Sequence, residues 1–212
     1  MKFPKLRKIF GITEGVFMQP KYDGVSLTLW YEEGKLIKAL TRGDGKVGED
    51  VIRNCNIPTI PQNINYNQTL IVREELVLRE KKRKARNIVS GALKTQDNPN
   101  KVNEVGGVFI AFDILNSVMT YKDKLDFLSN MFNCCHTKGF PKATIFKGTV
   151  LEDTLKIYKG MTNVDGLIIR SVIGNTHVAY KNNEDPVWTD LIEIETRVGD
   201  TGKVTYLAHF EL

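Results

Sequence analysis

The sequence predicts an α+β fold in which largely antiparallel sheets are flanked by helices. Residues 25–41 alternate apolar and polar side chains on either side of a Glu32-Glu33-Gly34 turn, which is the pattern of a β-hairpin with one buried face. The strand-like and helix-like runs that follow are mixed and show no regular strand–helix–strand rhythm, so a parallel sheet is disfavoured.

The other elements are predicted from apolar spacing and from the positions of glycine and proline. The hairpin is followed by a glycine-rich loop, Arg42–Asp50. Helical spacing is found at residues 83–95, 122–135 and 151–160. Strand-like runs cover residues 68–79, 108–115, 143–147, 164–172 and 191–196, and a last one begins at Val204.

Length and composition are those of a soluble globular protein. The chain has 212 residues, 42% of them hydrophobic and 26% charged, and it is long enough to bury a sizeable core. No apolar run reaches the roughly 20 residues that cross a bilayer. No signal-peptide core follows the basic N-terminus. We therefore expect a cytoplasmic protein with no membrane partner.

The charged residues, cysteines and histidines exclude few classes of function. A net charge of +5 is compatible with a phosphate-rich partner without requiring one, and a solvated loop explains the basic run at residues 79–86 as well as a DNA contact does. Cys55, Cys134 and Cys135 include an adjacent pair and no CxxC spacing, so we expect reduced thiols. The three histidines have no metal-ligand spacing and match no motif.

The strongest candidate for chemistry is Lys21-Tyr22-Asp23-Gly24, directly before the hairpin. A lysine between a strand end and a glycine turn can attack a phosphorus atom with its amine, provided that burial or neighbouring cations favour the unprotonated form. The four residues alone are weak evidence, because a β-turn with a solvated lysine has the same sequence.

Further segments extend this motif into a long pattern. They are Thr41–Gly45, Gly48–Val51, Ile57–Ile60, Val72–Glu75, Arg86–Lys94, Phe109–Phe112, Val164–Arg170, Val178–Lys181 and Val198–Thr205. In order and spacing, the chain from about residue 19 onward resembles the adenylation domain of NAD⁺-dependent DNA ligases. The resemblance implies the covalent nucleotidyltransferase fold for residues 1–188. For residues 189–212 it implies the first strands of a truncated OB-fold, or a linker to a missing one.

The resemblance implies four catalytic residues. Lys21 would attack the α-phosphorus of NAD⁺, release nicotinamide mononucleotide and become lysyl-AMP. Asp165 would orient Lys21 or act through a magnesium ion, and Lys181 would neutralise charge on the α-phosphate. Arg170 stands where the family has a phosphate-contacting lysine, so the charge is kept in a bulkier, forked group.

It also implies a nucleotide-binding set. Arg42 and Glu75 would hold the ribose, and Phe112 would stack on adenine. Gln19 replaces a family glutamate that reads the adenine amino group, and the carbonyl of a glutamine can still accept that hydrogen bond. Asp23 of the motif belongs to the same set.

Arg86 and Lys94 match family positions that grip the DNA backbone. They are eight residues apart in a predicted helix and hence on roughly one face. Two other departures from the family stand out. Asp200 reverses the charge of an arginine, and Glu74 replaces a glycine and so removes backbone freedom.

Family ligases carry further domains, which imply partners. They have an N-terminal helical domain that recognises nicotinamide mononucleotide, whereas only about twenty residues precede Lys21. They also carry an OB-fold, a zinc finger and helix-hairpin-helix modules after the core. We expect NAD⁺ as AMP donor, Mg²⁺, and nicked double-stranded DNA as substrate. Either the sequence is part of a longer protein, or a second ligase subunit supplies the OB-fold or the mononucleotide-binding domain. The second case would suit a phage acting in its host's cytoplasm.

Two alternatives stay open at this point. An ATP-dependent polynucleotide ligase would use the same lysine, although the Arg42–Gly45 run speaks against it. A degenerate ligase domain could serve as a nucleic-acid-binding or assembly module, and Arg170 favours this. Such a module has no need of Lys21, Asp165 and Lys181 together.

Overall fold

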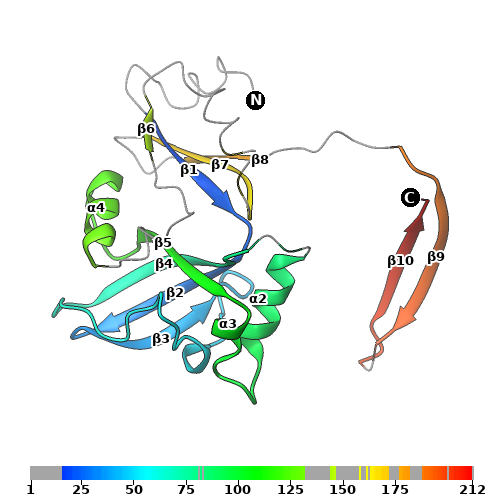
Figure 1. Ribbon diagram of the computed structural model, residues 1–212, viewed down its shortest axis with the longest axis horizontal. Coiled ribbons are helices and arrows are strands. Elements are labelled where there is room, and N and C mark those ends of the chain that lie inside the picture. The colour runs from blue at the N-terminus through cyan, green and yellow to red at the C-terminus, as the bar shows by residue number, and fades with distance from the viewer. Residues whose placement is uncertain are drawn as a thin grey trace. The chain divides into compact units, whose positions relative to one another are not determined.

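The computed structural model describes residues 16–80, 82, 84–131, 144–146, 158, 161, 163–171, 177–181, 188–199 and 201–211. The chain divides into two units, Met1–Asn182 and Asn183–Leu212 (Figure 1). The first unit contains two four-stranded sheets, and the second contains a two-stranded sheet.

One sheet of the first unit carries Lys21 in its second strand. The strand order is β6-β1-β7-β8, with antiparallel neighbours throughout. The strands are β1 (Val16–Tyr22), β6 (Thr144–Phe146), β7 (Val164–Ser171) and β8 (His177–Lys181). Successive side chains point to opposite faces. One face is apolar, where Met18 and Leu167 pack with Tyr158. The other face therefore carries Gln19 and Lys21.

The other sheet supports the main hydrophobic core. Its order is β3-β2-β4-β5, again antiparallel. The strands are β2 (Val25–Glu32), β3 (Lys35–Thr41), β4 (Leu70–Leu78) and β5 (Gly107–Ile114). Leu29, Val72 and Phe109 are fully buried on one face of this sheet. The opposite face is also partly apolar, with Val77 and Val108 packed beside Tyr22.

Helices cover the core face of this sheet. They are η1 (Ile52–Asn54), α2 (Ala85–Lys94), α3 (Lys101–Glu104) and α4 (Tyr121–Met131). Val89 and Leu93 of α2, together with Leu128 of α4, enter the core (Figure 1). The last turn of α2 is closed from outside the helix, because the buried amide of Asn54 donates to the carbonyl oxygens of Ala92 at 3.3 Å and Thr95 at 2.7 Å.

The glycine-rich loop after β3 is held by its own polar groups. One carboxylate oxygen of Asp44 accepts the backbone N–H groups of Lys46 and Val47, each at 2.8 Å. These two bonds lower the pKa of Asp44. The loop closes back on the strand, since the N–H of Glu49 donates to the hydroxyl oxygen of Thr41 at 3.0 Å.

The second unit is a hairpin of β9 (Leu191–Val198) and β10 (Val204–Phe210). Its register places Val198 opposite Val204 and Ile194 opposite Ala208, so one face is mainly apolar. Ile194 is 57% exposed and Tyr206 71% exposed. The assignment of residues 189–212 to an OB-fold stays a prediction.

The predicted fold class is confirmed, and every described strand-like run falls on an observed strand. β1 was expected only as the strand end before Lys21, and β8 was not expected. Cys55 is a free, buried thiol. Most of the helix predicted at residues 151–160 lies outside the described residues, as do Cys134, Cys135 and Asp200. In the described part of the chain, no helix is both long enough and apolar enough to span a bilayer.

Glu74 has a burial that the sequence did not predict. The expected loss of backbone freedom relative to a family glycine stays a prediction, and the residue lies in the middle of β4 and is only 1% exposed. Neither carboxylate oxygen has a hydrogen-bond partner among the described residues. Burial raises the pKa of its carboxyl from 4.5 to about 8. The substitution therefore also has an electrostatic consequence.

We predict that Glu74 makes the fold lose stability as the pH rises. The unfolded chain releases this proton near pH 4.5, while the folded chain keeps it up to about pH 8. The stabilising contribution of the Glu74 proton is thus fully present below pH 4.5 and is lost as the pH rises through about 8. Relative to Glu74→Gln, the wild-type free energy of unfolding should fall across this interval by up to about 1.4 kcal/mol per pH unit. Urea unfolding of both proteins at several pH values measures this, and parallel curves would contradict it.

Candidate active site around Lys21

The amine of Lys21 is paired with the carboxylate of Asp165. Both carboxylate oxygens lie 2.9 Å from the lysine Nζ, and the two side chains are 25% and 32% exposed. A β-bulge brings them together. Lys21 pairs with Gly166 and Tyr22 pairs with Val164, so Asp165 is the extra residue on β7. A bulge redirects a side chain, and here it turns Asp165 toward the lysine.

Gly166 lies beside this pair, where the backbone of β8 passes close to β7. It is directly opposite Lys21 on one side and Lys181 on the other, so the two lysines lie on the same face of the sheet in one row. A Cβ atom at Gly166 would lie 1.9 Å from the carbonyl oxygen of Tyr180. Only glycine permits this approach of β7 and β8. Lys181 itself is exposed.

The turn after Lys21 joins the site to the other sheet. A Cβ atom at Gly24 would lie 2.2 Å from the carbonyl oxygen of Leu76, so glycine is required for this contact. The N–H of Gly24 donates to the carboxylate of Glu75. Burial raises the pKa of Glu75 to about 7, against the lowering effects of Lys21 and Arg86. The neighbouring carboxylates of β4 thus point to opposite faces, Glu75 toward the lysine and Glu74 into the core.

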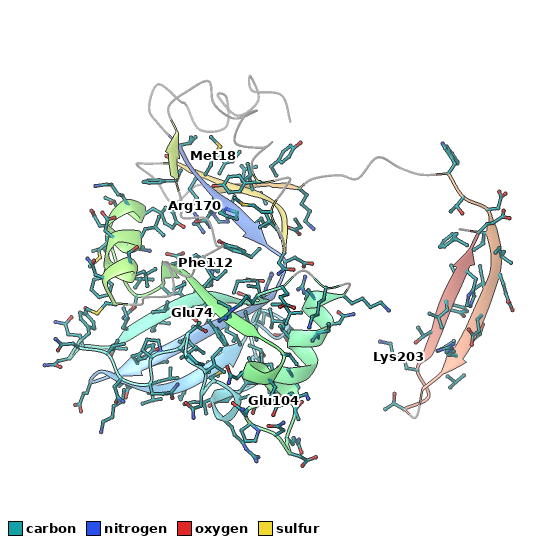
Figure 2. The ribbon with its side chains drawn as sticks, in the orientation of Figure 1. Met18, Glu74, Glu104, Phe112, Arg170 and Lys203 are labelled. Atoms are coloured by element: carbon teal, nitrogen blue, oxygen red, sulfur yellow. The ribbon has the colours of Figure 1, made fainter. Side chains whose placement is uncertain are left out.

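Gln19 and Arg170 meet at the start of α4. The guanidinium carbon of Arg170 lies 4.4 Å from the centre of the Tyr121 ring. The Tyr121 hydroxyl contacts the side-chain amide of Gln19 and lies 3.0 Å from the carbonyl oxygen of Phe112. Figure 2 shows Arg170 on the face of its sheet opposite Met18, and Phe112 on the strand below it. The Nε of Arg170 is buried without a hydrogen-bond partner among the described residues.

The other predicted residues lie farther out. Arg42 directly follows β3 and is exposed, with no side-chain hydrogen bond or ion pair to any described residue. Arg86 and Lys94 lie on the exposed side of α2. Arg86 is 3.9 Å from a carboxylate oxygen of Asp23, and Lys94 is 3.3 Å from one of Glu49. The structure therefore brings together Lys21, Asp165, Lys181 and Glu75 in one group, and Gln19, Phe112 and Arg170 in another.

Sequence reasoning missed Tyr121. No motif contains it, although Thr120 and Asp123 form a reciprocal helix cap that could have placed it at the first position of a helix. The bulge at Asp165 was also missed, because one extra residue in a strand leaves no mark in apolar alternation.

Comparisons with known proteins agree with this arrangement. A family model described as the NAD-dependent DNA ligase adenylation domain matches residues 3–84. A DNA ligase of Borrelia hermsii (strain HS1 / DAH) is 30% identical over 241 residues, and the match covers 96% of this chain. A DNA ligase of Mycoplasmopsis agalactiae is 32% identical over 225 residues, with 91% of this chain covered. These matches support the NAD-dependent DNA ligase family for this chain.

Within this family the chain corresponds to the adenylation domain, and the resemblance found in the sequence is confirmed. It spans 35% and 34% of the lengths of the two ligases. A solved structure from a study of Lig E DNA ligases, which bind DNA with a minimal scaffold, superposes with a TM-score of 0.53 at 15% identity. This superposition covers 91% of this chain and 77% of that one. At that identity the likeness concerns the fold alone.

A magnesium site can be tested against this adenylation domain. Among its described residues, no group of three or more His, Cys, Asp or Glu side chains could hold a metal ion. Mg²⁺ often takes only one or two carboxylates and completes its shell with water and phosphate oxygens. Asp165 is the carboxylate nearest Lys21. Asp165 is therefore the carboxylate that such an ion would meet beside Lys21.

We predict that Gly166→Ala damages the ligase domain locally. The new methyl group must push β8 away from β7, which we expect to cost at least about 2 kcal/mol of stability. The matched control is Gly91→Ala in α2, where a Cβ atom meets nothing within 4 Å. This control should stabilise the domain by about 1 kcal/mol. Urea unfolding of both variants is the measurement, and equal effects would refute the close approach at Gly166.

Proposed function

We propose that this chain is the adenylation core of an NAD⁺-dependent DNA ligase that acts in the cytoplasm. The Lys21 amine attacks the α-phosphorus of NAD⁺. An N–P bond forms, the bond to nicotinamide mononucleotide breaks, and the amine gives up a proton. The adenylate then passes from lysyl-AMP to the 5′-phosphate at a DNA nick.

The observation that carries this proposal is the pair of Lys21 and Asp165, with Lys181 in the same row across Gly166. An amine held by two contacts of 2.9 Å has a fixed direction, which favours an in-line approach to phosphorus. The same carboxylate is the adjacent acceptor for the proton that the amine loses. Lys181, on the same face across Gly166, would neutralise charge that builds on the α-phosphate. Arg170 would add a second cation to the phosphates.

The nucleotide would lie along the face that carries Gln19 and Lys21. Glu75 would accept hydrogen bonds from the ribose hydroxyls, and Arg42 would help to hold the ribose. Asp23 would support the ribose end from the turn beside Lys21. Phe112 would stack on the adenine.

Mg²⁺ and DNA complete the proposed reaction. Asp165 would hold a magnesium ion brought in by the nucleotide, and when bound the ion lowers the negative charge of the phosphates. Arg86 and Lys94 would contact the backbone of nicked double-stranded DNA, each after leaving its carboxylate. A second polypeptide, or further domains of a longer chain, would supply the OB-fold and the mononucleotide-binding domain.

The alternatives are weaker on the same residues. An ATP-dependent polynucleotide ligase would use Lys21 in the same way, but the family match concerns the NAD-dependent domain. A non-catalytic module that only binds nucleic acid would gain nothing from a paired Lys21 with Lys181 beside it.

We predict that the purified chain acquires one AMP on Lys21 when incubated with NAD⁺, and much less with ATP. Lys21→Ala should abolish the modification, and Lys181→Ala should slow it by about 100-fold because a preorganised charge is lost. Lys35→Ala, an exposed lysine of β3, is the control and should behave as wild type. Intact-mass analysis with peptide mapping measures all three variants. Preferential modification by ATP would favour the first alternative. No modification by either nucleotide, with a mononucleotide-binding domain supplied, would favour the second.

We further predict that the chain alone seals nicks poorly. Without a domain that positions the leaving group, reaction with NAD⁺ should be slow, and without an OB-fold the affinity for the nick should be low. Gel analysis of a nicked duplex with NAD⁺, with and without a candidate second subunit, measures this. Efficient sealing by the chain alone would contradict the need for a partner.

A further inference from the structure

Tyr121 connects two residues of the nucleotide site. It is the first residue of α4 and is 8% exposed. Its hydroxyl faces the amide of Gln19 on β1 and the carbonyl oxygen of Phe112 on β5, the latter at 3.0 Å. One hydroxyl thus touches the residue proposed to read the adenine edge and the backbone of the residue proposed to stack on adenine.

This contact has too few hydrogens for its acceptors. A tyrosine hydroxyl has one hydrogen to donate, and a carbonyl oxygen can only accept. If the Gln19 amide presents its oxygen to the hydroxyl, that oxygen and the Phe112 carbonyl compete for a single hydrogen. A half turn of the amide resolves the conflict. Nε2–H of Gln19 then donates to the tyrosine oxygen, and the tyrosine hydrogen goes to Phe112.

We propose that Tyr121 fixes the Gln19 amide with its oxygen turned toward the nucleotide base, which makes the site selective for adenine. This inference rests on the proposed function, because it deepens the nucleotide specificity of the same site. Tyr121 is a positioning residue, since it acts on the base through Gln19.

The surroundings of Tyr121 keep its hydroxyl in place. Its ring meets Phe17 edge-on at 5.6 Å and lies under Arg170 at 4.4 Å. Thr120 and Asp123 cap the helix at this point. Burial raises the pKa of Tyr121, so the hydroxyl stays protonated and remains a donor.

The orientation of the amide decides which base edge is accepted. With its oxygen outward, Gln19 accepts from the amino group of adenine. With its NH₂ outward, it would instead donate to the oxygen that replaces this amino group in hypoxanthine. A family glutamate has no such choice, because neither carboxylate oxygen can donate. A glutamine at this position therefore needs a second residue to set its direction.

The test compares the binding of AMP and IMP to the full chain by calorimetry. Wild type should prefer AMP. Tyr121→Phe keeps the ring contacts but frees the amide, so the ratio of the two dissociation constants should fall by about tenfold, the worth of one hydrogen bond. The double variant Gln19→Glu/Tyr121→Phe should regain the preference for AMP, because a glutamate accepts in either orientation.

Tyr66→Phe is the matched control. Tyr66 also packs its ring against α4, at 5.4 Å from Phe127, and its hydroxyl contacts Gln68. Its loss should leave the AMP-to-IMP ratio unchanged. An unchanged ratio in Tyr121→Phe would overturn the inference while leaving the proposed function intact. Failure of Gln19→Glu to restore the ratio would also overturn it, since the effect would then be structural. If wild type binds neither nucleotide, the proposed function itself fails.

Discussion

The bulge at Asp165 is the feature on which the site depends. In regular pairing, alternate residues of β7 would point away from Lys21, and an aspartate in this position would face the other side of the sheet. The extra residue turns the carboxylate toward the amine. Gly166 follows immediately and lets β8 approach closely enough to bring Lys181 into the same row. One local irregularity and one missing side chain thus assemble three charged groups from three strands.

Two adjacent carboxylates show how the faces of a strand divide structure from function. Glu74, which is buried, and Glu75, which is partly buried, both have a raised pKa because burial disfavours the charged form. Glu75 is offset by Lys21 and Arg86 and accepts the N–H of Gly24, so it lies among polar partners. Glu74 lies among apolar side chains and raises the pKa of the Cys55 thiol, which burial already raises, to about 12. Glu75 therefore suits a binding role, whereas the burial of Glu74 among apolar side chains is unfavourable for the core.

Much of the fold could be predicted from the sequence because its signals are local. The alternation of apolar and polar residues predicted the hairpin of β2 and β3, and the helical spacing of apolar residues predicted α2 and α4. The lysine motif and its glycines also predicted the turn, since Gly24 is required where the backbone of Leu76 passes. The contacts of Gln19 and Arg170 with Tyr121 could not be predicted. They join residues up to 102 positions apart, and no pattern in either strand encodes the helix that meets them. The burial of Glu74 was hidden for the opposite reason, because a charged residue in a strand normally indicates the solvent face.

The two cations of α2 form ion pairs that a bound polyanion would have to replace. Arg86 and Lys94 each lie beside a carboxylate, of Asp23 and Glu49 respectively, and both carboxylates belong to the loops that flank the first hairpin. A phosphate that takes either cation only exchanges one anion for another, so the net gain in attraction is small. The exchange does, however, release a carboxylate. One of the two released groups, Asp23, stands two residues from Lys21, so a polyanion bound on α2 would change the charge close to the Lys21 amine.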